Sequence, residues 1–309
     1  MLVNRLDGVA FRLKRFYDFS YLKKYGTAFT AFDETGSGCI CIGMQDEHSK
    51  FFCKIAGADT VEAVVTPEES VEVLKKAVTI YQDVRHASVP KLLDAYFYGR
   101  FYTAVFAWAD GACLFDHWNF DRYAKDPSLR PPRDRFLTLP ADKKLRCADV
   151  LFSFLMTVAR AGYVAVDFYD GSILYDFDTD TTTICDLDFF RKAPAVNTRG
   201  EGWFGTKRLK APEEYVLGAR IDERTNVFTL GALLFEFFGR FSAADIERRY
   251  RENRFVPCPL GGWELNRQTY EAACRAVSPE RRGRFESVEQ FYAAWNRALR
   301  AQEVGWPCI

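Results

Sequence analysis

The spacing of apolar residues changes near Gly111, and this change divides the chain into a strand-rich part and a helical part. Before it, apolar residues alternate with polar ones or run together in short stretches that Gly, Asp and Thr interrupt, which is typical of a small antiparallel sheet. Between these stretches, Thr66 is followed by Pro67 and two glutamates, a pattern that predicts the capped first turn of one helix. Strands are predicted at residues 26–34, 38–44, 50–58, 90–99 and 100–109.

After Gly111 the pattern favours helices. Residues 119–140 are polar and rich in proline, which predicts an inserted surface loop or a short helix. A strand hairpin is predicted at residues 172–176 and 181–190. Helices are predicted at residues 141–163, 227–239, 243–253, 266–277 and 287–301. We therefore expect an α+β fold in two lobes, and ligands commonly bind in the cleft between such lobes.

Composition supports this division and narrows the environment. The 309 residues, of which 48% are hydrophobic, are enough for a large core. The 42 basic residues balance 42 acidic ones, so no overall field favours nucleic acid or an anionic membrane as a partner. Residues 1–25 lack the apolar centre of a signal peptide, and the long apolar runs contain Arg160 and Glu236. We expect a cytoplasmic protein, with Lys23 and Lys24 on a solvated helix that packs on the small lobe.

The nine cysteines give little sign of a metal site. Cys39 and Cys41 share one face of a predicted strand, but no second pair of Cys or His follows to complete four ligands. Reduced, mostly buried thiols are expected, which again indicates a reducing compartment.

Two aspartates, Asp167 and Asp186, lie at the ends of predicted apolar strands, where an unpaired charge is costly. Pairing the two strands as a hairpin places Asp167, Ser172 and Asp186 at one end of it. Magnesium suits such a set, because it binds through one or two carboxylates together with the phosphates of a nucleotide. Four other aspartates are predicted to be simple turn residues, namely Asp170, Asp176, Asp178 and Asp180.

At these residues the chain resembles the eukaryotic-type protein kinases. Residues 163–174, YVAVDFYDGSIL, are similar to the catalytic-loop pattern YxHRDLKxxNIL, with Asp167 at the catalytic aspartate and Ser172 at the asparagine. CDLDFF stands where kinases carry DFG and places Asp186 at the metal-binding aspartate. FFCK stands in the place of VAIK, so the resemblance implies Lys54 as the phosphate-binding lysine.

Three later motifs follow in the order that kinases show. GTKRLKAPEE resembles the GTxxYxAPE segment that closes the activation loop, through Thr206 and Glu213 among others. TNVFTLG is similar to the start of the SDVWSLG helix, and SPERRGRF to the late DPxxRxT motif. The resemblance therefore implies an ion pair between Glu213 and Arg282, and it covers roughly residues 26–295.

The resemblance implies a bilobal kinase-like fold, ATP and Mg²⁺ as cofactors, and a protein or peptide as substrate or regulatory partner. Asp167 would orient and deprotonate a Ser or Thr hydroxyl, while Asp186 and Ser172 would hold magnesium. The implied parts are an N-terminal extension (1–25), a small sheet lobe with one main helix (26–110), a larger helical lobe (111–300) and a C-terminal tail (301–309). The implied nucleotide pocket is formed by Gly38, Ile40, Phe52, Lys54, the gatekeeper Phe106, the backbone of Ala107 and Ala109, and Leu174.

The chain departs from the kinase pattern around the phosphates and the adenine. Asp33 and Thr35 stand in place of the first two glycines of the phosphate loop, where side chains obstruct close approach and an acid repels phosphate. Phe52 replaces a small alanine on the strand face that Lys54 shares, so its ring could fill the adenine pocket. Tyr169 replaces the lysine that helps to hold the transferring phosphate.

The charged partners differ as well. Ala77 stands where a helix glutamate pairs with the lysine of active kinases, and Glu72 is more than a turn away, so Lys54 is expected to lean toward Asp186.

The arginine before the catalytic aspartate is also missing, because Ala165 and Val166 replace the histidine and arginine of the motif. The loop that follows offers only Thr198 as a hydroxyl, so no phosphorylation switch of the usual type is expected.

Three functions stay open on these residues. An ATP-dependent Ser/Thr protein kinase ranks first, because the charged residues that carry the chemistry are retained. A pseudokinase, which keeps the fold as a binding or scaffold module, is favoured by the losses around the phosphates. A small-molecule kinase of the aminoglycoside or choline type ranks last, because it would not need the GTKRLKAPE segment; fold-level analogy does not choose among the three.

Overall fold

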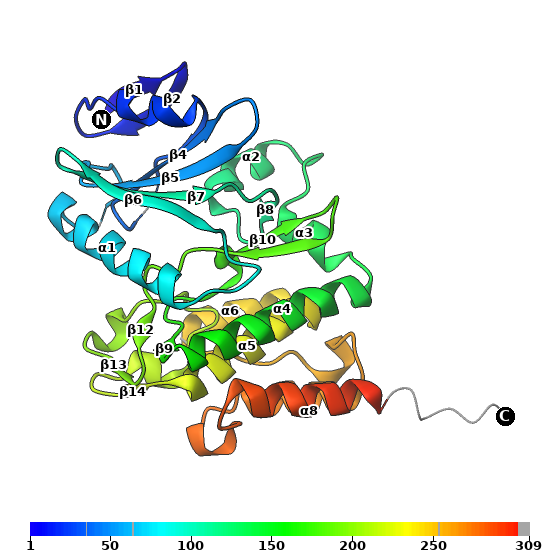
Figure 1. Cartoon of the computed structure of the whole chain (residues 1–309). Helices are drawn as coiled ribbons and strands as arrows, with labels where there is room; N and C mark the ends of the chain where they lie inside the picture. The colour runs from blue at the N-terminus through cyan, green and yellow to red at the C-terminus, as the bar shows by residue number, and fades with distance from the viewer. Residues whose placement is uncertain (35, 64, 253, 302–309) are drawn as a thin grey trace. The chain divides into compact units, whose positions relative to one another are not determined.

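The structure is a computed structural model that describes residues 1–34, 36–63, 65–252 and 254–301 (Figure 1). The chain divides into two compact units. The first unit consists of residues 1–110 and 183–188, and the second of residues 111–182 and 189–309. The fold is mixed α+β, with small antiparallel sheets and several helices.

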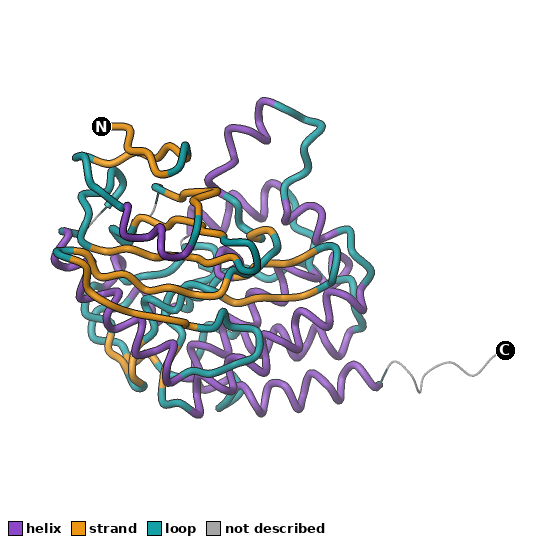
Figure 2. Tube along the Cα trace, turned by 45° about the horizontal axis from the view of Figure 1, so that its top comes forward, coloured by secondary structure: helices purple, strands orange, loops and turns teal. Residues whose placement is uncertain are grey.

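The first unit is built on an antiparallel sheet of five strands in the order β3-β4-β5-β7-β6 (Figure 2). The strands are β3 (Thr27–Phe32), β4 (Ile40–Gln45), β5 (Lys50–Ala56), β6 (Leu92–Tyr98) and β7 (Phe101–Ala107). All five predicted strands are confirmed. Short apolar stretches between turn residues favour strands of this length.

The predicted helix of the first unit is α1 (Pro67–Asp83). The Thr66 side chain accepts the Glu69 N–H, and the Glu69 side chain accepts the Thr66 N–H, which completes a capping box. The buried side chains of α1 cover one face of the sheet, where they pack with Ala56, Ala104 and Phe106.

The opposite face of the sheet is covered by the N-terminal residues. A hairpin of β1 (Leu2–Leu6) and β2 (Val9–Leu13) precedes a short 3-10 helix, η1 (Ser20–Tyr25). Leu13, Phe19 and Leu22 are buried against β4 and β5, and Figure 1 shows the hairpin and α1 on opposite sides of the sheet. The predicted N-terminal helix is thus confirmed only for η1, since residues 2–13 form a hairpin.

The second unit is mainly helical. Its α-helices are α2 (Phe120–Lys125), α3 (Pro132–Leu137), α4 (Ala141–Arg160), α5 (Glu223–Phe238), α6 (Ala243–Glu252), α7 (Arg267–Ala276) and α8 (Val288–Arg300). The predicted long helices are confirmed, and residues 119–140, expected as a loop or a short helix, form the two short helices α2 and α3. The residues from Thr225 to Phe238 of α5 are all buried, so this helix is the centre of the unit. Gly231 lets α7 approach α5 closely, because a Cβ there would lie 2.8 Å from the Cβ of Ala276.

Short strands and single turns connect these helices. The strands are β8 (Ala112–Cys113), β9 (Tyr163–Val164), β10 (Ile173–Asp176), β11 (Thr181–Ile184), β12 (Arg191–Lys192), β13 (Ala195–Val196) and β14 (Arg220–Ile221). The 3-10 turns are η2 (His117–Asn119), η3 (Asp170–Ser172), η4 (Gly200–Gly202), η5 (Pro212–Tyr215), η6 (Leu260–Gly262) and η7 (Arg281–Gly283). β10 and β11 are neighbours in one sheet, which confirms the predicted hairpin, and the chain enters the first unit within β11, at Thr183.

Among the residues described, no helix has the length and apolar character needed to cross a lipid bilayer.

Candidate functional site

A charge cluster around Lys54 is the most distinctive feature of the first unit. Lys54 lies on β5, opposite Cys41 of β4 and Ala104 of β7, and is 9% exposed. Its Nζ donates to Asp188 and lies 3.2 Å from Asp186 Oδ1. Burial by itself lowers the pKa of Lys54, but the charges of Asp188 and Asp186 outweigh it and raise this pKa well above its ordinary value. The ammonium group therefore stays charged.

The two aspartates differ in their surroundings. The Asp186 side chain is 44% exposed, whereas that of Asp188 is 1% exposed. Burial raises the pKa of Asp188, Lys54 opposes this, and the charge of Asp186 adds to it. Asp188 Oδ1 has no hydrogen-bond partner among the described residues. One oxygen of a buried carboxylate thus has no bond from the protein around it, which is costly unless another group binds it.

The segment that carries both aspartates is fixed from both ends within the first unit. The N–H of Ile184 donates to Ser88 O at 2.7 Å, and the N–H of Leu187 donates to the Tyr81 hydroxyl at 3.4 Å. Asp186 itself has a φ of 61°, in the left-handed region that an L-residue seldom adopts. Strain of this kind persists where surrounding contacts over-determine the backbone, and it concentrates at functional sites.

The expected contact between Lys54 and Asp186 is present, but the sequence analysis missed Asp188. Ala77 is fully buried, and Glu72 of α1 is paired with Lys75 at 2.9 Å. Asp188 therefore supplies the buried counter-ion that the helix lacks. The available signal was a second acid inside the apolar run CDLDFF, where a charge needs a partner.

The predicted phosphate loop is only partly as expected. Gly38 has a φ of 76°, and a Cβ there would lie 3.0 Å from Val65 and 3.1 Å from Ser70, so glycine is required. Asp33 does not present a free charge, because Arg12 of β2 donates to it from its backbone and from its guanidinium. Thr35 lies outside the described residues.

The prediction for Ile40 is wrong. In the β4–β5 register Ile40 lies opposite Ile55, and both are buried on the face that the N-terminal residues cover. Cys41 lies opposite Lys54 instead. Side chains alternate along a strand, so the error of one position moved the residue to the other face of the sheet.

Aromatic rings occupy the region predicted to bind adenine. Phe52 lies 6.3 Å from both Phe32 and Trp108 between ring centroids, and Phe29 lies 4.8 Å from Trp108. Phe106 is buried, with its ring 4.6 Å from that of Tyr81. These rings form an apolar surface on the sheet beside Lys54.

The two backbone positions predicted to bond an adenine follow this surface. Ala107 N–H donates to Lys91 O at 2.9 Å, and Ala109 follows Trp108, whose N–H donates to Lys50 O at 3.0 Å. Their bonds to an adenine stay a prediction.

Asp167 and Ser172 belong to the second unit, in the loop after β9. Asp167 also has a left-handed backbone, with a φ of 60°. The N–H of Ala165 donates to the buried Asn226 Oδ1 of α5 at 3.0 Å, which ties this loop to the central helix. Ser172 is fully buried, and its N–H donates to Tyr169 O at 2.9 Å. Leu174 follows on β10, opposite Cys113 of β8.

Asp170 is not a simple turn residue, which corrects the prediction. Its side chain is buried and accepts a bond from Arg208 Nη2 at 2.7 Å, and its pKa is raised by burial against the opposing charge of Arg208. Arg208 Nη1 also lies 3.3 Å from Glu236 of α5, which Arg133 and Arg249 contact as well. By contrast, Asp176 accepts the N–H of Asp178 as a turn residue does.

The segment that contains Thr206 also belongs to the second unit. The carbonyl of Thr206 accepts the N–H groups of Leu209 and Lys210. Lys210 is buried and donates to the carbonyl of Trp203 at 2.7 Å; burial lowers its pKa, and the charges of Glu214 and Asp167 oppose this. Burial raises the pKa of Glu214 to about 8.

Glu213 forms the predicted kind of ion pair, but with other arginines. Its two oxygens accept bonds from Arg284 Nη1 at 2.8 Å and Arg284 Nη2 at 3.0 Å, and Arg281 Nη1 lies 2.9 Å from Oε1. The predicted partner Arg282 is therefore wrong. The motif predicted the right turn of the chain. The backbone of η7 directs Arg281 and Arg284 toward Glu213, and not Arg282.

The structure thus brings Lys54, Asp186 and Asp188 together in the first unit, and holds Asp167 and Ser172 on a separate, well-anchored loop in the second. Among the described residues no group of three or more His, Cys, Asp or Glu forms a cage for a metal ion. Two carboxylates with one unsatisfied oxygen fit a hard cation such as Mg²⁺, which takes its other ligands from water and phosphates.

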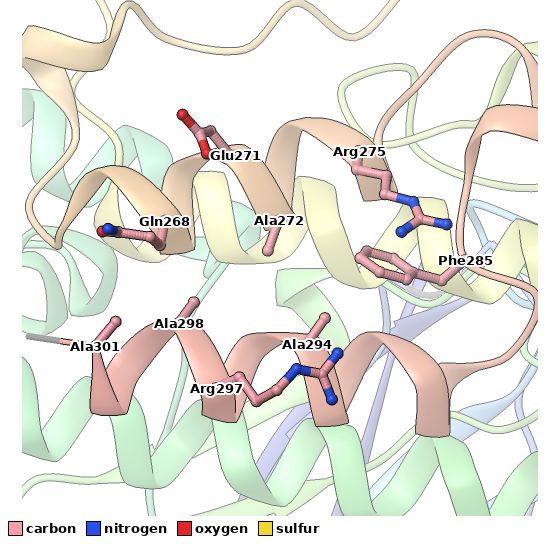
Figure 3. A pocket seen from close by; sticks show the side chains of 9 residues that line it. All are labelled: Gln268, Glu271, Ala272, Arg275, Phe285, Ala294, Arg297, Ala298 and Ala301. Carbon is pink, nitrogen blue, oxygen red and sulfur yellow. The ribbon is translucent and has the colours of Figure 1, made fainter.

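A hollow of about 390 Å³ between α7 and α8 in the second unit contains none of the predicted site residues (Figure 3). It is lined by Gln268, Glu271, Ala272, Arg275, Phe285, Ala294, Arg297, Ala298 and Ala301. Its floor is formed largely by alanines, and Arg275 is already placed over the ring of Phe285 at 4.2 Å. No chemistry is evident there.

Comparison of the sequence with protein-family models gives no match, and a search among curated proteins gives none either.

Proposed function

We propose that the chain is a phosphotransferase of the protein-kinase type, which moves the γ-phosphate of ATP to a Ser or Thr hydroxyl. The observation that carries this proposal is the Lys54 ammonium between two carboxylates, one of them buried with an unsatisfied oxygen. A buried carboxylate oxygen without a partner is costly, and a bound cation would relieve that cost.

The proposed roles follow from exposure and charge. Lys54 binds the phosphates of the nucleotide as a buried cation, and a phosphate oxygen competes with the carboxylates for its N–H donors. Asp186 and Asp188 would hold Mg²⁺, because the carboxylate of Asp186 is partly exposed and one oxygen of Asp188 has no partner among the described residues. The metal ion, when bound, neutralises charge on the transferring phosphate. Asp167 accepts the proton of the substrate hydroxyl from a backbone held by Asn226.

A second candidate is a binding module that has kept the fold without the reaction. It is favoured by Phe52, whose ring lies between Phe32 and Trp108 beside the proposed phosphate site. In this alternative the rings take the space of a base, and Lys54 stays with its two aspartates.

Thermal unfolding with and without ATP and Mg²⁺ tests the proposal. Saturating nucleotide should stabilise a true binder by a few kcal/mol. The stabilisation should disappear in Asp186→Asn and persist in Asp176→Asn, which removes a turn acid of the second unit. No stabilisation of the native protein would refute the phosphotransferase and favour the binding module.

Transfer of labelled phosphate then distinguishes a protein kinase from a small-molecule kinase. Label on a generic Ser/Thr protein substrate supports the proposal, whereas label only on an aminoglycoside would indicate a small-molecule kinase. Asp167→Asn should retain the nucleotide-induced stabilisation and lose the transfer, because Asp167 acts on the hydroxyl and not on the nucleotide.

A further inference from the structure

Positive charge is concentrated in one segment of a chain whose total charge is balanced. Residues 189–210 contain six basic residues and one acidic residue, Glu201. Two of the basic residues have internal tasks: Arg208 binds Asp170, and Lys210 donates to the carbonyl of Trp203. Lys192 lies over the ring of Tyr163 at 3.7 Å, so we look to Arg191 and Arg199 for a local charge that can act on a ligand.

Arg191 lies over both rings of one aromatic pair, and Arg199 lies over one of the two. Phe189 and Phe204 are stacked, with ring centroids 4.4 Å apart and an interplanar angle of 25°. The guanidinium carbon of Arg191 lies 5.5 Å from the Phe204 centroid and 5.9 Å from that of Phe189. The guanidinium carbon of Arg199 lies 4.8 Å from the Phe204 centroid. Both cations therefore lie against the Phe204 ring.

The contacts with the rings hold the two guanidinium groups in place although their like charges repel each other. Burial, and secondly the charge of Arg199, lower the pKa of Arg191, and no carboxylate contributes to this balance. Arg191 Nη1 donates to the adjacent carbonyl of Phe190 at 3.0 Å, and no ion pair is formed by either guanidinium within the described part of the chain. Two close, unneutralised guanidinium groups on a rigid support have the composition of an anion site.

The support is fixed by backbone pairing as well as by the rings. Arg191 is on β12 and pairs with Val164 of β9, and the buried Val164 packs with Trp203 and the Phe204 ring. Arg199 follows Asn197, whose buried side chain accepts the Arg199 N–H at 2.9 Å and donates to the carbonyls of Gly200 and Glu214. Both arginines thus start from ordered backbone, which reduces the entropy lost on binding.

We propose that Arg191 and Arg199, on the Phe189–Phe204 stack, form a binding site for a phosphomonoester dianion. Two planar forks match the oxygens of one phosphate group, and its two negative charges balance the two cations. A carboxylate carries half that charge and binds more weakly. This site is independent of the Lys54 cluster and does not depend on the phosphotransferase proposal.

Titration of the full chain with inorganic phosphate, followed by ³¹P line broadening at constant ionic strength, tests the site. Saturable binding is expected, with acetate at the same ionic strength a poor competitor. Arg199→Ala should weaken the binding about tenfold or more. Arg146→Ala, which removes an exposed arginine paired with Asp142 elsewhere in the second unit, should leave it unchanged.

Further variants keep the test decisive if one of them folds poorly. Arg199→Lys keeps the charge but loses the fork and should bind more weakly than the native chain. Phe204→Leu should weaken the binding of phosphate, although it removes no charge. Equal binding by the native chain and Arg199→Ala, or binding lost in Lys54→Met and kept in Arg199→Ala, would overturn the proposal.

A serine phosphopeptide and its unphosphorylated form separate the sources of the phosphate. Tighter binding of the phosphopeptide than of inorganic phosphate, lost in Arg199→Ala, indicates a phosphorylated polypeptide as ligand. Equal affinity for the two indicates free phosphate at the same site. Equal affinity for the two peptides, with no effect of Arg199→Ala, contradicts the site.

Discussion

The clusters around Glu213 and Lys54 are both buried and charged, but they are completed in different ways. Glu213 has two arginines for one carboxylate, and Thr225 Oγ1 fills a further position on its Oε1 at 2.8 Å. Arg284 in turn donates its Nε to Ser278 O at 2.7 Å. Around Lys54 one cation faces two carboxylates, and an oxygen of Asp188 is left over.

The comparison sets a cluster whose charged groups are all bonded beside the one that we propose to bind a ligand. A fully bonded network has nothing to gain from a small molecule, so its residues contribute by joining η5 to the first turn of α5 and to η7. An excess of negative charge with an unsatisfied atom gains when a cation arrives. We use this difference to rank the expected effects of substitutions.

The largest effect is expected for Arg284→Met. It leaves the buried Glu213 carboxylate without its bidentate partner, and breaking such a pair costs about 3–5 kcal/mol. Urea unfolding measures the loss. Arg282→Met, two positions earlier, should change stability by less than about 0.5 kcal/mol. A larger loss for Arg282→Met than for Arg284→Met would contradict the assignment of the Glu213 partner.

Lys54→Met should have the next largest effect, about 2–4 kcal/mol, because it leaves two close carboxylates without a cation. Millimolar Mg²⁺ should partly restore the stability of Lys54→Met, since the ion can replace the ammonium charge. It should not restore the stability of Arg284→Met. Unfolding with and without Mg²⁺ checks this. Lys50→Met, on the same strand but exposed, is the matched control and should show neither effect.

Glu214 predicts a pH dependence in the second unit. Its pKa is raised to about 8 by burial, from an ordinary value of 4.5. The folded state therefore binds the proton more tightly, so this contribution to stability is complete below about pH 4.5 and is lost as pH rises toward 8. The slope is at most about 1.4 kcal/mol per pH unit. Glu214→Gln should remove it, and unfolding free energies of both proteins at pH 5, 6, 7 and 8 measure the difference. Parallel curves would show that Glu214 is ionised in the folded protein.

The smallest effect on stability is expected for Asp186→Asn. Its side chain is 44% exposed, and Lys54 keeps Asp188, so the change should stay within about 0.5 kcal/mol. Asp188→Asn should cost more, because it changes the fully buried partner. Similar losses for the two variants in urea unfolding would remove the distinction between the exposed and the buried carboxylate.

The elements of the first unit were largely predictable from sequence because their signals are local. The Thr66 cap and the short apolar stretches predicted α1 and the five strands. The β1–β2 hairpin was missed, although Asp7 and Gly8 form the two-residue connection that such hairpins favour. Residues 2–13 mix charged and apolar residues, and no strands were predicted from this pattern.

The parts of the site that were not predictable depend on register and on distant neighbours. Ile40 was placed by counting back along the sequence from Lys54, and one position decides which face of a strand a residue occupies. Arg284 and Asp188 were missed for a related reason: a motif locates a turn, but packing selects which of several similar residues points inward. Asp170 shows that a turn-like sequence can hold a buried ion pair when an arginine far along the chain reaches it.

The N-terminal covering of the sheet has a practical consequence for how the protein is produced. A shortened chain that begins at Gly26, the limit of the kinase resemblance, would remove Leu13, Phe19 and Leu22 and uncover Ile42 and Met44. A sheet face stripped in this way is an aggregation surface. Truncations intended to isolate the small lobe should therefore retain the residues from Leu2 onward, and insolubility of a shorter version would say nothing about catalysis.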